Sequence, residues 1–309
     1  MRIAIVGTGG VGGYFGARLV QAGYDVSFIA RGANLVAIRD HGLRIESIAG
    51  DLLVHPHVTD DPTTVGPVDL IMLAVKSWQL PAACASLGPL IGPTSAVLPL
   101  LNGVEAADRV VAAVGVEHTM GGLCRILAEL VAPGHVRHSA IVPTIVLGEL
   151  DNRRSVRVEA YQEALQHAAI QTEIARDIQV AIWQKFMLIC TWSGLGAITR
   201  APIGVWRSLP ATRALAVQLL DEIAAVATAR GIALPPGAAA ATMGFLDGVA
   251  PNGTSSMQRD MLEGRPSELE AQSGAVVRLG AAAGVATPLN ALIYACLLPQ
   301  ELAARGERS

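Results

Sequence analysis

The stretch Arg2-Ile3-Ala4-Ile5-Val6-Gly7-Thr8-Gly9-Gly10-Val11-Gly12 decides the fold. Its apolar first half predicts a buried strand of a parallel sheet, and the glycines that follow have the spacing G-x-G-x-x-G. A helix is expected over residues 14–22, ending at Gly23, because a glycine suits the left-handed geometry found after a helix C-terminus. The glycine pattern alone is a weak signal. Between a strand and a helix, however, it predicts a turn that binds a dinucleotide.

The glycines of this turn have separate physical roles. Gly7 permits the tight turn, Gly9 lets the backbone approach a pyrophosphate, and Gly12 lets the helix pack closely on the strand. The helix N-terminus then offers N–H groups and a favourable dipole to the diphosphate. The alternative is a plain strand-to-helix turn without a nucleotide. The candidate cofactor-binding residues of the loop are Gly7, Thr8, Gly9, Gly10, Val11 and Gly12.

The composition excludes several classes of protein. A length of 309 residues suggests about two domains. With 51% hydrophobic and 16% charged residues, the chain is too apolar for a disordered protein and too poor in charge for a coiled coil. The net charge of −3 and the absence of a basic block argue against a nucleic-acid partner. A glycine-rich, aromatic-poor chain is typical of an α/β enzyme.

The mean hydropathy of +0.44 raises the question of a membrane span. The uncharged residues 77–104 contain four prolines, and residues 279–299 are interrupted by glycines and by Thr287-Pro288. Both runs therefore predict buried segments, and the N-terminus lacks the pattern of a signal peptide. We expect a cytoplasmic protein with free, mostly buried cysteines. No metal site is expected, because the histidines lack partners at ligand spacing.

Apolar runs and the segments between them predict two domains. Further strands are expected at residues 25–30, 70–75, 96–101 and 120–127, with crossover helices between them, and residues 137–149 are expected to form a hairpin at the edge. Beyond Arg176 the apolar residues have helical spacing. The expected fold class is α/β: an N-terminal Rossmann dinucleotide-binding domain over residues 1–176 and an all-helical C-terminal domain over residues 177–309.

The end of the second strand selects the cofactor. An NAD site usually places Asp or Glu here, where the carboxylate binds the ribose 2′-hydroxyl. This chain has Ala30-Arg31-Gly32 instead. A guanidinium at this position would pair with a 2′-phosphate and stack on adenine, which favours NADPH. The alternative for Arg31 is a solvated charge in a loop.

Polar residues also follow two other predicted strands. Lys76 comes directly after residues 70–75, and Asn102 comes after residues 96–101. Because the carboxyl ends of parallel strands meet at one edge of a sheet, we expect both side chains to line the same crevice. The alternatives are a surface lysine and an ordinary turn residue.

Lys185 is a lone lysine in the otherwise uncharged residues 181–199. Burial of an ammonium costs several kcal/mol unless it is paired or its pKa falls. A desolvated lysine is therefore a candidate general acid for a carbonyl oxygen, the alternative being a surface lysine that extends its amine to water. Glu268 lies near a helix start marked by Pro266. The hydroxyls of residues 254–256 precede another helix start, where they could bind an anionic group or simply cap the helix.

The chain resembles the ketopantoate reductase (2-dehydropantoate 2-reductase) family over essentially its whole length. The resemblance implies a Rossmann domain, a helical domain like that of 6-phosphogluconate dehydrogenase, and an active site in the cleft between them. It also implies NADPH-dependent reduction of 2-dehydropantoate to (R)-pantoate, a step of pantothenate and coenzyme A synthesis. The residues that carry it are the glycine loop, Arg31, Ala74-Val75-Lys76-Ser77-Trp78-Gln79, Leu101-Asn102-Gly103-Val104-Glu105, Trp183-Gln184-Lys185-Phe186, Thr254-Ser255-Ser256-Met257-Gln258-Arg259-Asp260 and Arg265-Pro266-Ser267-Glu268-Leu269-Glu270.

The resemblance also implies roles for single residues. Lys185 would protonate the ketone oxygen, Glu268 would hydrogen-bond the substrate hydroxyl or the cofactor, and Asn102 would hold the nicotinamide side and the reacting centre. The residues expected to contact the cofactor are Arg31, Lys76, Gln79 and Asn102. Those expected to bind the substrate are Lys185, Ser193, Ser255, Ser256 and Glu268, with Ser256 on the carboxylate.

The sequence departs from the family pattern on the helix that carries the lysine. Well-known members have asparagines one and two helical turns after it, where this chain has Ile189 and Ser193. Isoleucine cannot hydrogen-bond a substrate hydroxyl, and the loss of such a bond strongly changes how an enzyme discriminates between substrates. A different branched 2-oxo acid is therefore an alternative substrate, and a non-catalytic NADPH-binding sensor is a less favoured function. The Ala-rich C-terminal helices suggest a homodimer.

Overall fold

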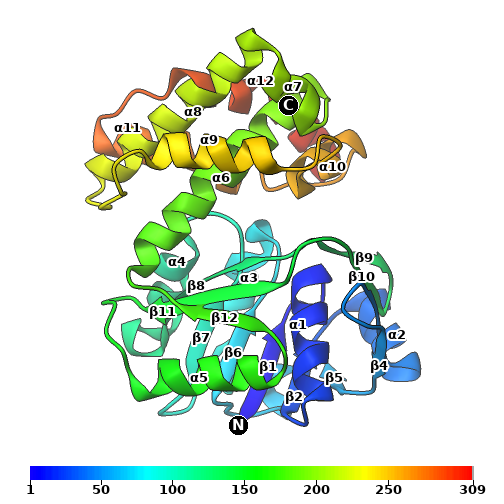
Figure 1. The fold of residues 1–309 in the computed structure, drawn as a ribbon. Helices are drawn as coiled ribbons and strands as arrows, with labels where there is room; N and C mark the ends of the chain where they lie inside the picture. Colours follow the sequence, from blue (N-terminus) through cyan, green and yellow to red (C-terminus); the bar gives the residue numbers. More distant parts are fainter. Residues whose placement is uncertain (308–309) are drawn as a thin grey trace. The chain divides into compact units, whose positions relative to one another are not determined.

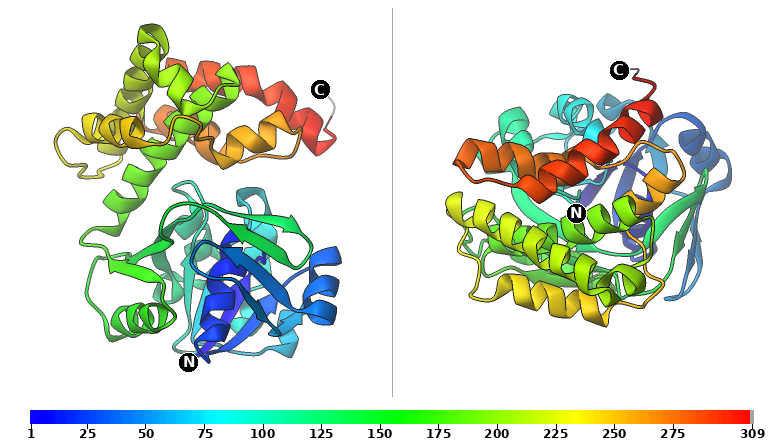
Figure 2. Two further views of the ribbon diagram at one scale, coloured as in Figure 1. Left: turned by 45° about the vertical axis from the view of Figure 1, so that its right-hand side comes forward. Right: turned by 90° about the horizontal axis from the view of Figure 1, so that it is seen from above.

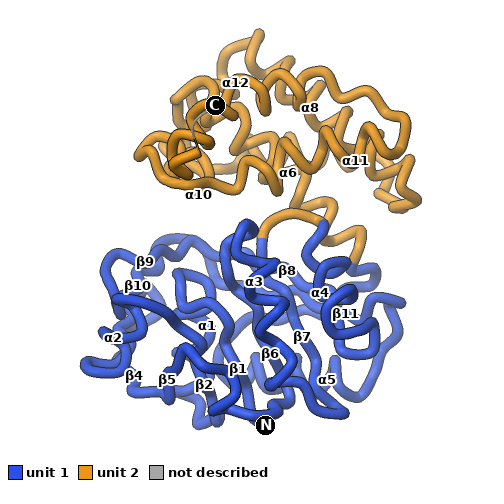
Figure 3. Tube along the Cα trace, turned by 180° about the vertical axis from the view of Figure 1, so that it is seen from behind, with its two compact units in different colours: residues 1–101, 105–178 blue, residues 102–104, 179–309 orange. Residues whose placement is uncertain are grey.

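The structure, a computed structural model, describes residues 1–307 (Figure 1). The chain forms two compact units, coloured separately in Figure 3. The first contains residues 1–101 and 105–178, and the second contains residues 102–104 and the chain from residue 179 onward. The expected boundary at residues 176 and 177 lies close to the end of the first unit. The assignment of the two parts to cofactor binding and to substrate binding stays a prediction.

A five-stranded parallel sheet forms the centre of the first unit, in the order β5-β2-β1-β6-β7. This is the strand order of a Rossmann fold, so the predicted fold class is confirmed. Four of the strands, β1, β2, β6 and β7, are buried along almost their whole length, which explains their largely apolar sequences. The strands are β1 (Arg2–Val6), β2 (Asp25–Ile29), β5 (His57–Thr59), β6 (Leu70–Leu73) and β7 (Ala96–Pro99).

Helix α1 (Gly10–Gln21) begins four residues before the expected start at residue 14. Glycine has a low helix propensity, which by itself would favour a later start. Tertiary packing overrides that propensity, because a Cβ at Gly12 would lie 2.0 Å from the Gly7 oxygen and one at Gly16 would lie 2.5 Å from the Phe28 ring. The other helices of this unit are α2 (Gly32–His41), α3 (Leu80–Ala85), α4 (Ala106–Val114) and α5 (Val156–His167).

Two smaller sheets complete the first unit. One has the order β4-β3-β10-β9 and the other β12-β11-β8. The expected hairpin at residues 137–149 is wrong, because β10 and β11 belong to different sheets. Between them, Ala140 and Ile141 have positive φ angles and break the strand. The hairpin of this region is β9–β10, which turns at Gly134. The strands are β3 (Leu43–Ser47), β4 (Leu52–Val54), β8 (Met120–Arg125), β9 (Ala128–Ala132), β10 (His135–His138), β11 (Thr144–Glu149) and β12 (Gln171–Ile174).

The second unit is helical in its described part, as predicted (Figure 2). Its core gathers the apolar sides of the helices around residues such as Trp206 and Leu220, which are 1% and 0% exposed. The helices are α6 (Ile178–Thr199), α7 (Ile203–Ser208), α8 (Pro210–Ala229), α9 (Ala238–Gly248), α10 (Ser256–Leu262), the π-helical turn η5 (Glu270–Gly274), α11 (Ala275–Ala283) and α12 (Pro288–Arg305).

The apolar runs that raised the membrane question end at helix boundaries. Residues 279–299 divide between α11 and α12, with Gly284 in the left-handed region after α11 and Pro288 at the first position of α12. Among the described residues, no helix combines the length and apolarity needed to cross a membrane. The cysteines are free, with Cys84, Cys124 and Cys190 buried and Cys296 exposed.

Candidate functional site

The glycine loop has the geometry that a dinucleotide site requires. Gly7 has φ +98°, which favours glycine, and a Cβ at Gly12 would overlap the Gly7 oxygen. Gly9 is different, because no heavy atom of the surrounding chain lies within 4 Å of an ideal Cβ there. The fold therefore needs glycine at positions 7 and 12, whereas position 9 leaves room for a ligand to approach the backbone. The loop fits a pyrophosphate at the N-terminus of α1.

Gly10 serves the fold rather than a ligand. Its ideal Cβ would lie 2.3 Å from the Ala128 oxygen and 2.9 Å from the Glu129 nitrogen, both in strand β9. A side chain here would push the β9–β10 hairpin away from the start of α1. The close approach of β9 was not visible in the sequence, because residues 10 and 128 are far apart along the chain.

Asn34 holds the glycine loop and was missed by the sequence reasoning. Its Nδ2 donates to the Thr8 carbonyl at 2.9 Å and to Thr8 Oγ1 at 2.6 Å. Its Oδ1 accepts the Gly134 N–H at 2.7 Å. Both ends of the amide are therefore used to join the loop, helix α2 and the β9–β10 turn. A single asparagine near a helix start resembles any turn residue, so no sequence pattern could have identified it.

Arg31 and Lys76 lie at the carboxyl edge of the parallel sheet with the glycine loop. The Gly7 N–H donates to the Ile29 carbonyl at 3.3 Å, which joins the loop to the end of β2 just before Arg31. Arg31 is exposed at the N-cap position of α2. On the other side of Gly7 lies the backbone of residues 74 and 75, and Lys76 follows directly. The Lys76 Nζ lies 5.6 Å from the centre of the Trp78 ring.

Gln79 has a local structural contact. Its Oε1 accepts the Lys76 N–H at 3.1 Å, and its own N–H donates to the Lys76 carbonyl at 2.9 Å. These two bonds fix the turn after β6 and the starting point of the Lys76 side chain. A direct contact between Gln79 and a cofactor stays a prediction.

Asn102 and Glu268 are joined by a hydrogen bond within the second unit. The Asn102 Nδ2 donates to Glu268 Oε2 at 2.7 Å, although 166 residues separate them. Glu268 is 4% exposed, so this bond compensates part of the cost of burying its carboxylate. Gly103 has φ +99°, and its ideal Cβ would lie 3.0 Å from the Ala271 oxygen. Glycine at 103 therefore lets the loop after β7 approach the turn that follows Glu268.

Lys185 is the only charged residue within the 22 residues of α6. It is partly buried, between the exposed Gln184 and the buried Phe186. One turn later, Ile189 is partly buried and packs against the helical core, and Ser193 is 1% exposed. The three positions 185, 189 and 193 follow one face of the helix. This face therefore presents one cation, one apolar side chain and one enclosed hydroxyl.

The two serines at the start of α10 differ in position. Ser255 is the N-cap residue, and its hydroxyl accepts the Gln258 N–H at 3.1 Å. The capping alternative therefore describes Ser255 well, while Ser256 begins the helix and is partly buried. Binding of a substrate by either hydroxyl stays a prediction. In residues 1–307, no three His, Cys, Asp or Glu side chains are grouped in a way that could hold a metal ion.

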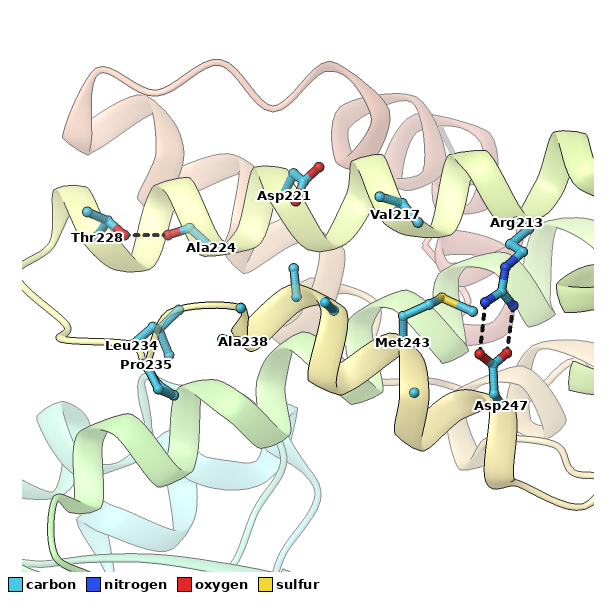
Figure 4. Close-up of a pocket in the computed structure, with 14 residues that line it drawn as sticks. Arg213, Val217, Asp221, Ala224, Thr228, Leu234, Pro235, Ala238, Met243 and Asp247 are labelled. Carbon is cyan, nitrogen blue, oxygen red and sulfur yellow. Dashed lines mark hydrogen bonds and ion pairs between the residues drawn. The ribbon is translucent and has the colours of Figure 1, made fainter.

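A groove of about 690 Å³ lies elsewhere in the second unit, between α8 and α9 (Figure 4). Arg213 and Asp247 form an ion pair at one end, and Thr228 and Leu234 lie at the other. None of the predicted site residues lines this groove. Its size alone therefore does not identify it as the catalytic site.

The chain matches models of two domains of one family. The description "Ketopantoate reductase PanE/ApbA" applies to residues 3–152, and "Ketopantoate reductase PanE/ApbA C terminal" applies to residues 177–301. Among curated relatives, the uncharacterized oxidoreductase YkpB of Bacillus subtilis is 29% identical over 297 residues, covering 96% of this chain and 98% of the relative.

Solved structures are similar to this chain over its whole length. A PanE/ApbA family ketopantoate reductase from Ralstonia eutropha JMP134 is 30% identical with a TM-score of 0.90, covering 99% of this chain and 100% of the other. A D-mandelate dehydrogenase in a ternary structure with NADH and anilino(oxo)acetate is 25% identical with a TM-score of 0.91, covering 99% of each chain. The chain therefore belongs to the ketopantoate reductase PanE/ApbA family and is an oxidoreductase that acts on a CH–OH group.

Proposed function

We propose that this chain reduces 2-dehydropantoate (ketopantoate) to (R)-pantoate with NADPH, as a step of pantothenate and coenzyme A biosynthesis. The observation that carries the proposal is the buried Glu268 carboxylate, held at 2.7 Å by Asn102 in the unit whose longest helix contains a single charged residue, Lys185. This combination supplies a hydrogen-bond acceptor and a proton donor for a substrate with a hydroxyl and a ketone. Family membership supports the same reaction.

The chemistry assigns different tasks to the residues of the second unit. When the ketone carbon is reduced, its oxygen becomes an alkoxide and must receive a proton. The Lys185 ammonium donates that proton and is reprotonated from water. Glu268 accepts a hydrogen bond from the substrate hydroxyl, and Asn102 fixes the direction of the carboxylate. Ser256, with Ser255 and Ser193, would bind the carboxylate and the remaining polar atoms of the substrate.

The residues of the first unit would hold the cofactor, which supplies the hydride when it is bound. Residues 7–12 would surround the pyrophosphate, and the Arg31 guanidinium would pair with a 2′-phosphate. The absence of Asp or Glu directly after β2 supports NADPH, whereas the D-mandelate dehydrogenase structure holds NADH. Comparison of kcat/KM for NADPH and NADH tests this point. Arg31→Ala should raise KM for NADPH much more than KM for NADH, because only NADPH carries the 2′-phosphate.

A steady-state assay with NADPH and ketopantoate tests the proposed reaction. Turnover of ketopantoate with the highest kcat/KM among several 2-oxo acids would support it. Lys185→Ala should reduce kcat by about a hundredfold or more, the usual contribution of a general acid. Full turnover by this variant would disprove the role of Lys185. Tight NADPH binding without turnover of any 2-oxo acid would instead indicate a non-catalytic sensor.

Ile189 favours one alternative substrate class, a different branched 2-oxo acid with an apolar tail. Its side chain lies one turn beyond Lys185 and packs against the helical core, so this position offers an apolar contact. The likeness to a D-mandelate dehydrogenase is consistent with such a substrate. If this alternative is correct, Ile189→Asn should lower kcat/KM for the apolar acid and raise it for ketopantoate. A preference unchanged by the substitution would exclude Ile189 as its determinant.

We also propose that the protein is a cytoplasmic homodimer. Large apolar side chains are exposed on the helices of the second unit and between them, including Val205, Leu209 and Phe245, which are 50%, 53% and 57% exposed. Burial of such side chains between two copies would remove apolar surface from water. Light scattering coupled to size-exclusion chromatography should give a mass of two chains, and a mass of one chain would disprove the dimer.

A further inference from the structure

The residue before Glu268 is held by the last helix, α12. Both carboxylate oxygens of Glu301 accept the Ser267 N–H, at 3.1 and 3.0 Å, and Oε2 also accepts the Ser267 hydroxyl at 2.5 Å. Arg305 donates to the Ser267 carbonyl at 3.1 Å and pairs with Glu301 at 2.6 Å. Ser267 is 0% exposed and Glu301 is 3% exposed. The N–H, O–H and C=O groups of Ser267 are therefore all fixed from one helix.

The backbone on the other side of Glu268 is fixed as well. The Ser267 hydroxyl oxygen accepts the Leu269 N–H at 3.2 Å, and the Glu268 carbonyl accepts the Gln272 N–H at 3.0 Å. Glu268 therefore lies between two restrained peptide groups. Its side-chain torsions then decide where the carboxylate points, and the bond from Asn102 helps to set them.

Stability alone does not explain the Glu301 carboxylate. Burial of an ion pair carries a large desolvation cost, and well-packed apolar residues often stabilise a protein equally well. What the pair provides is orientation, because a carboxylate can accept the N–H and the O–H of one residue together. We propose that Glu301 is a positioning residue that acts through Ser267 to hold the Glu268 carboxylate in the direction used for the substrate. This inference rests on the proposed function of Glu268.

Glu222 offers a matched control at the opposite end of α12. Its carboxylate accepts the N–H groups of Leu289 and Asn290, at 2.8 and 3.0 Å, and the Asn290 side chain at 2.7 Å. Glu222→Gln and Glu301→Gln therefore make the same chemical change to two carboxylates that both fasten this helix. A merely structural role predicts the same kinetic effect for both substitutions.

We expect Glu301→Gln to lower kcat roughly tenfold to a hundredfold, the range for a displaced catalytic group. KM for NADPH should change much less than kcat, because most of the residues proposed to bind the cofactor lie in the other unit. Glu222→Gln should leave kcat at the wild-type value. In a Glu268→Gln background, Glu301→Gln should add no further loss, since the carboxylate that it positions is absent. The same loss of kcat in both backgrounds, or in the control variant, would overturn the inference.

Amide hydrogen exchange tests the same link without turnover. The amides of residues 267–269 should exchange slowly in the wild-type protein, faster in Glu301→Gln and at the wild-type rate in Glu222→Gln. If the wild-type protein reduces no 2-oxo acid, the proposed function fails, and the exchange rates still decide whether Glu301 holds this segment. Unchanged exchange in Glu301→Gln would overturn the inference even if the enzyme is active.

Discussion

Substitution of Gly9 and Gly12 by alanine should separate ligand binding from packing in one loop. At Gly12 the new methyl carbon would lie 2.0 Å from the Gly7 oxygen, 3.0 Å from Ile5 Cγ2 and 3.1 Å from Ala74 Cβ. A normal carbon–oxygen contact is about 3.3 Å or longer, so α1 or the Gly7 peptide must move by about 1 Å. Overpacking of this kind costs about 3 kcal/mol, at the upper end of the usual range.

The expected loss of stability in Gly12→Ala can be measured by thermal unfolding. For a domain of this size, each kcal/mol lowers Tm by about 2–4 °C, so Gly12→Ala should lower it by about 6–12 °C. At Gly9, alanine adopts φ −77° and ψ −161° without strain, and the chain leaves space for its methyl group. Alanine is a poorer N-cap than glycine, which costs about 1 kcal/mol and about 2–4 °C.

The affinity for NADPH should show the opposite ranking of the two variants: Gly9→Ala should weaken binding more than Gly12→Ala. Gly9→Ala places a methyl group where the pyrophosphate must approach the backbone, so Kd measured by calorimetry should rise at least about tenfold, or 1.4 kcal/mol. NADPH binding at the wild-type Kd by Gly9→Ala would refute the assignment of the loop. A wild-type Tm for Gly12→Ala would refute the packing argument.

Other parts of the molecule give further predictions. Burial alone would raise the pKa of Glu149, but hydrogen bonds from Arg157 and Ser155 outweigh it and hold that pKa below 4.5. This carboxylate therefore stabilises the fold above about pH 4.5 and loses its contribution as the pH falls through its lower folded pKa. The free energy of unfolding should consequently fall less steeply with decreasing pH in Glu149→Gln than in the wild-type protein. Cys296 should react with a thiol reagent in the folded protein. Reaction of a second cysteine without unfolding would contradict the burial of the other three. Asn34→Ala should raise the Kd for NADPH several-fold, since it leaves Thr8 and the Gly134 N–H without their partner; an unchanged Kd would show that the loop holds its shape alone.

Features with a strong local signal could be predicted from the sequence. The apolar strands and the glycine spacing indicated the parallel sheet and its binding turn, because a buried strand and the turn that follows it each leave a pattern in consecutive residues. Lys185 could be selected because a single charge interrupts a long apolar helix. The start of α1 was predicted too late, since the glycines at its beginning are placed there by contacts with Gly7 and with β9.

Features that depend on distant parts of the chain could not be predicted. Asn102 and Glu268 were each selected separately, but their direct bond depends on the loop after β7 reaching the helical unit. The apolar alternation in residues 137–149 suggested a hairpin because the pattern does not show that the strand breaks at Ala140. Glu301 shows no local pattern, and only the folded chain brings its carboxylate to Ser267.

The assignment of residues 102–104 to the helical unit has an evolutionary consequence. The polypeptide passes from one unit to the other at three points, after residues 101, 104 and 178. Recombination at the last of these points alone would join the helical part to a foreign nucleotide-binding part and leave Glu268 without its native amide partner. The two halves must therefore be inherited together, or the incoming half must supply an asparagine on the same short loop.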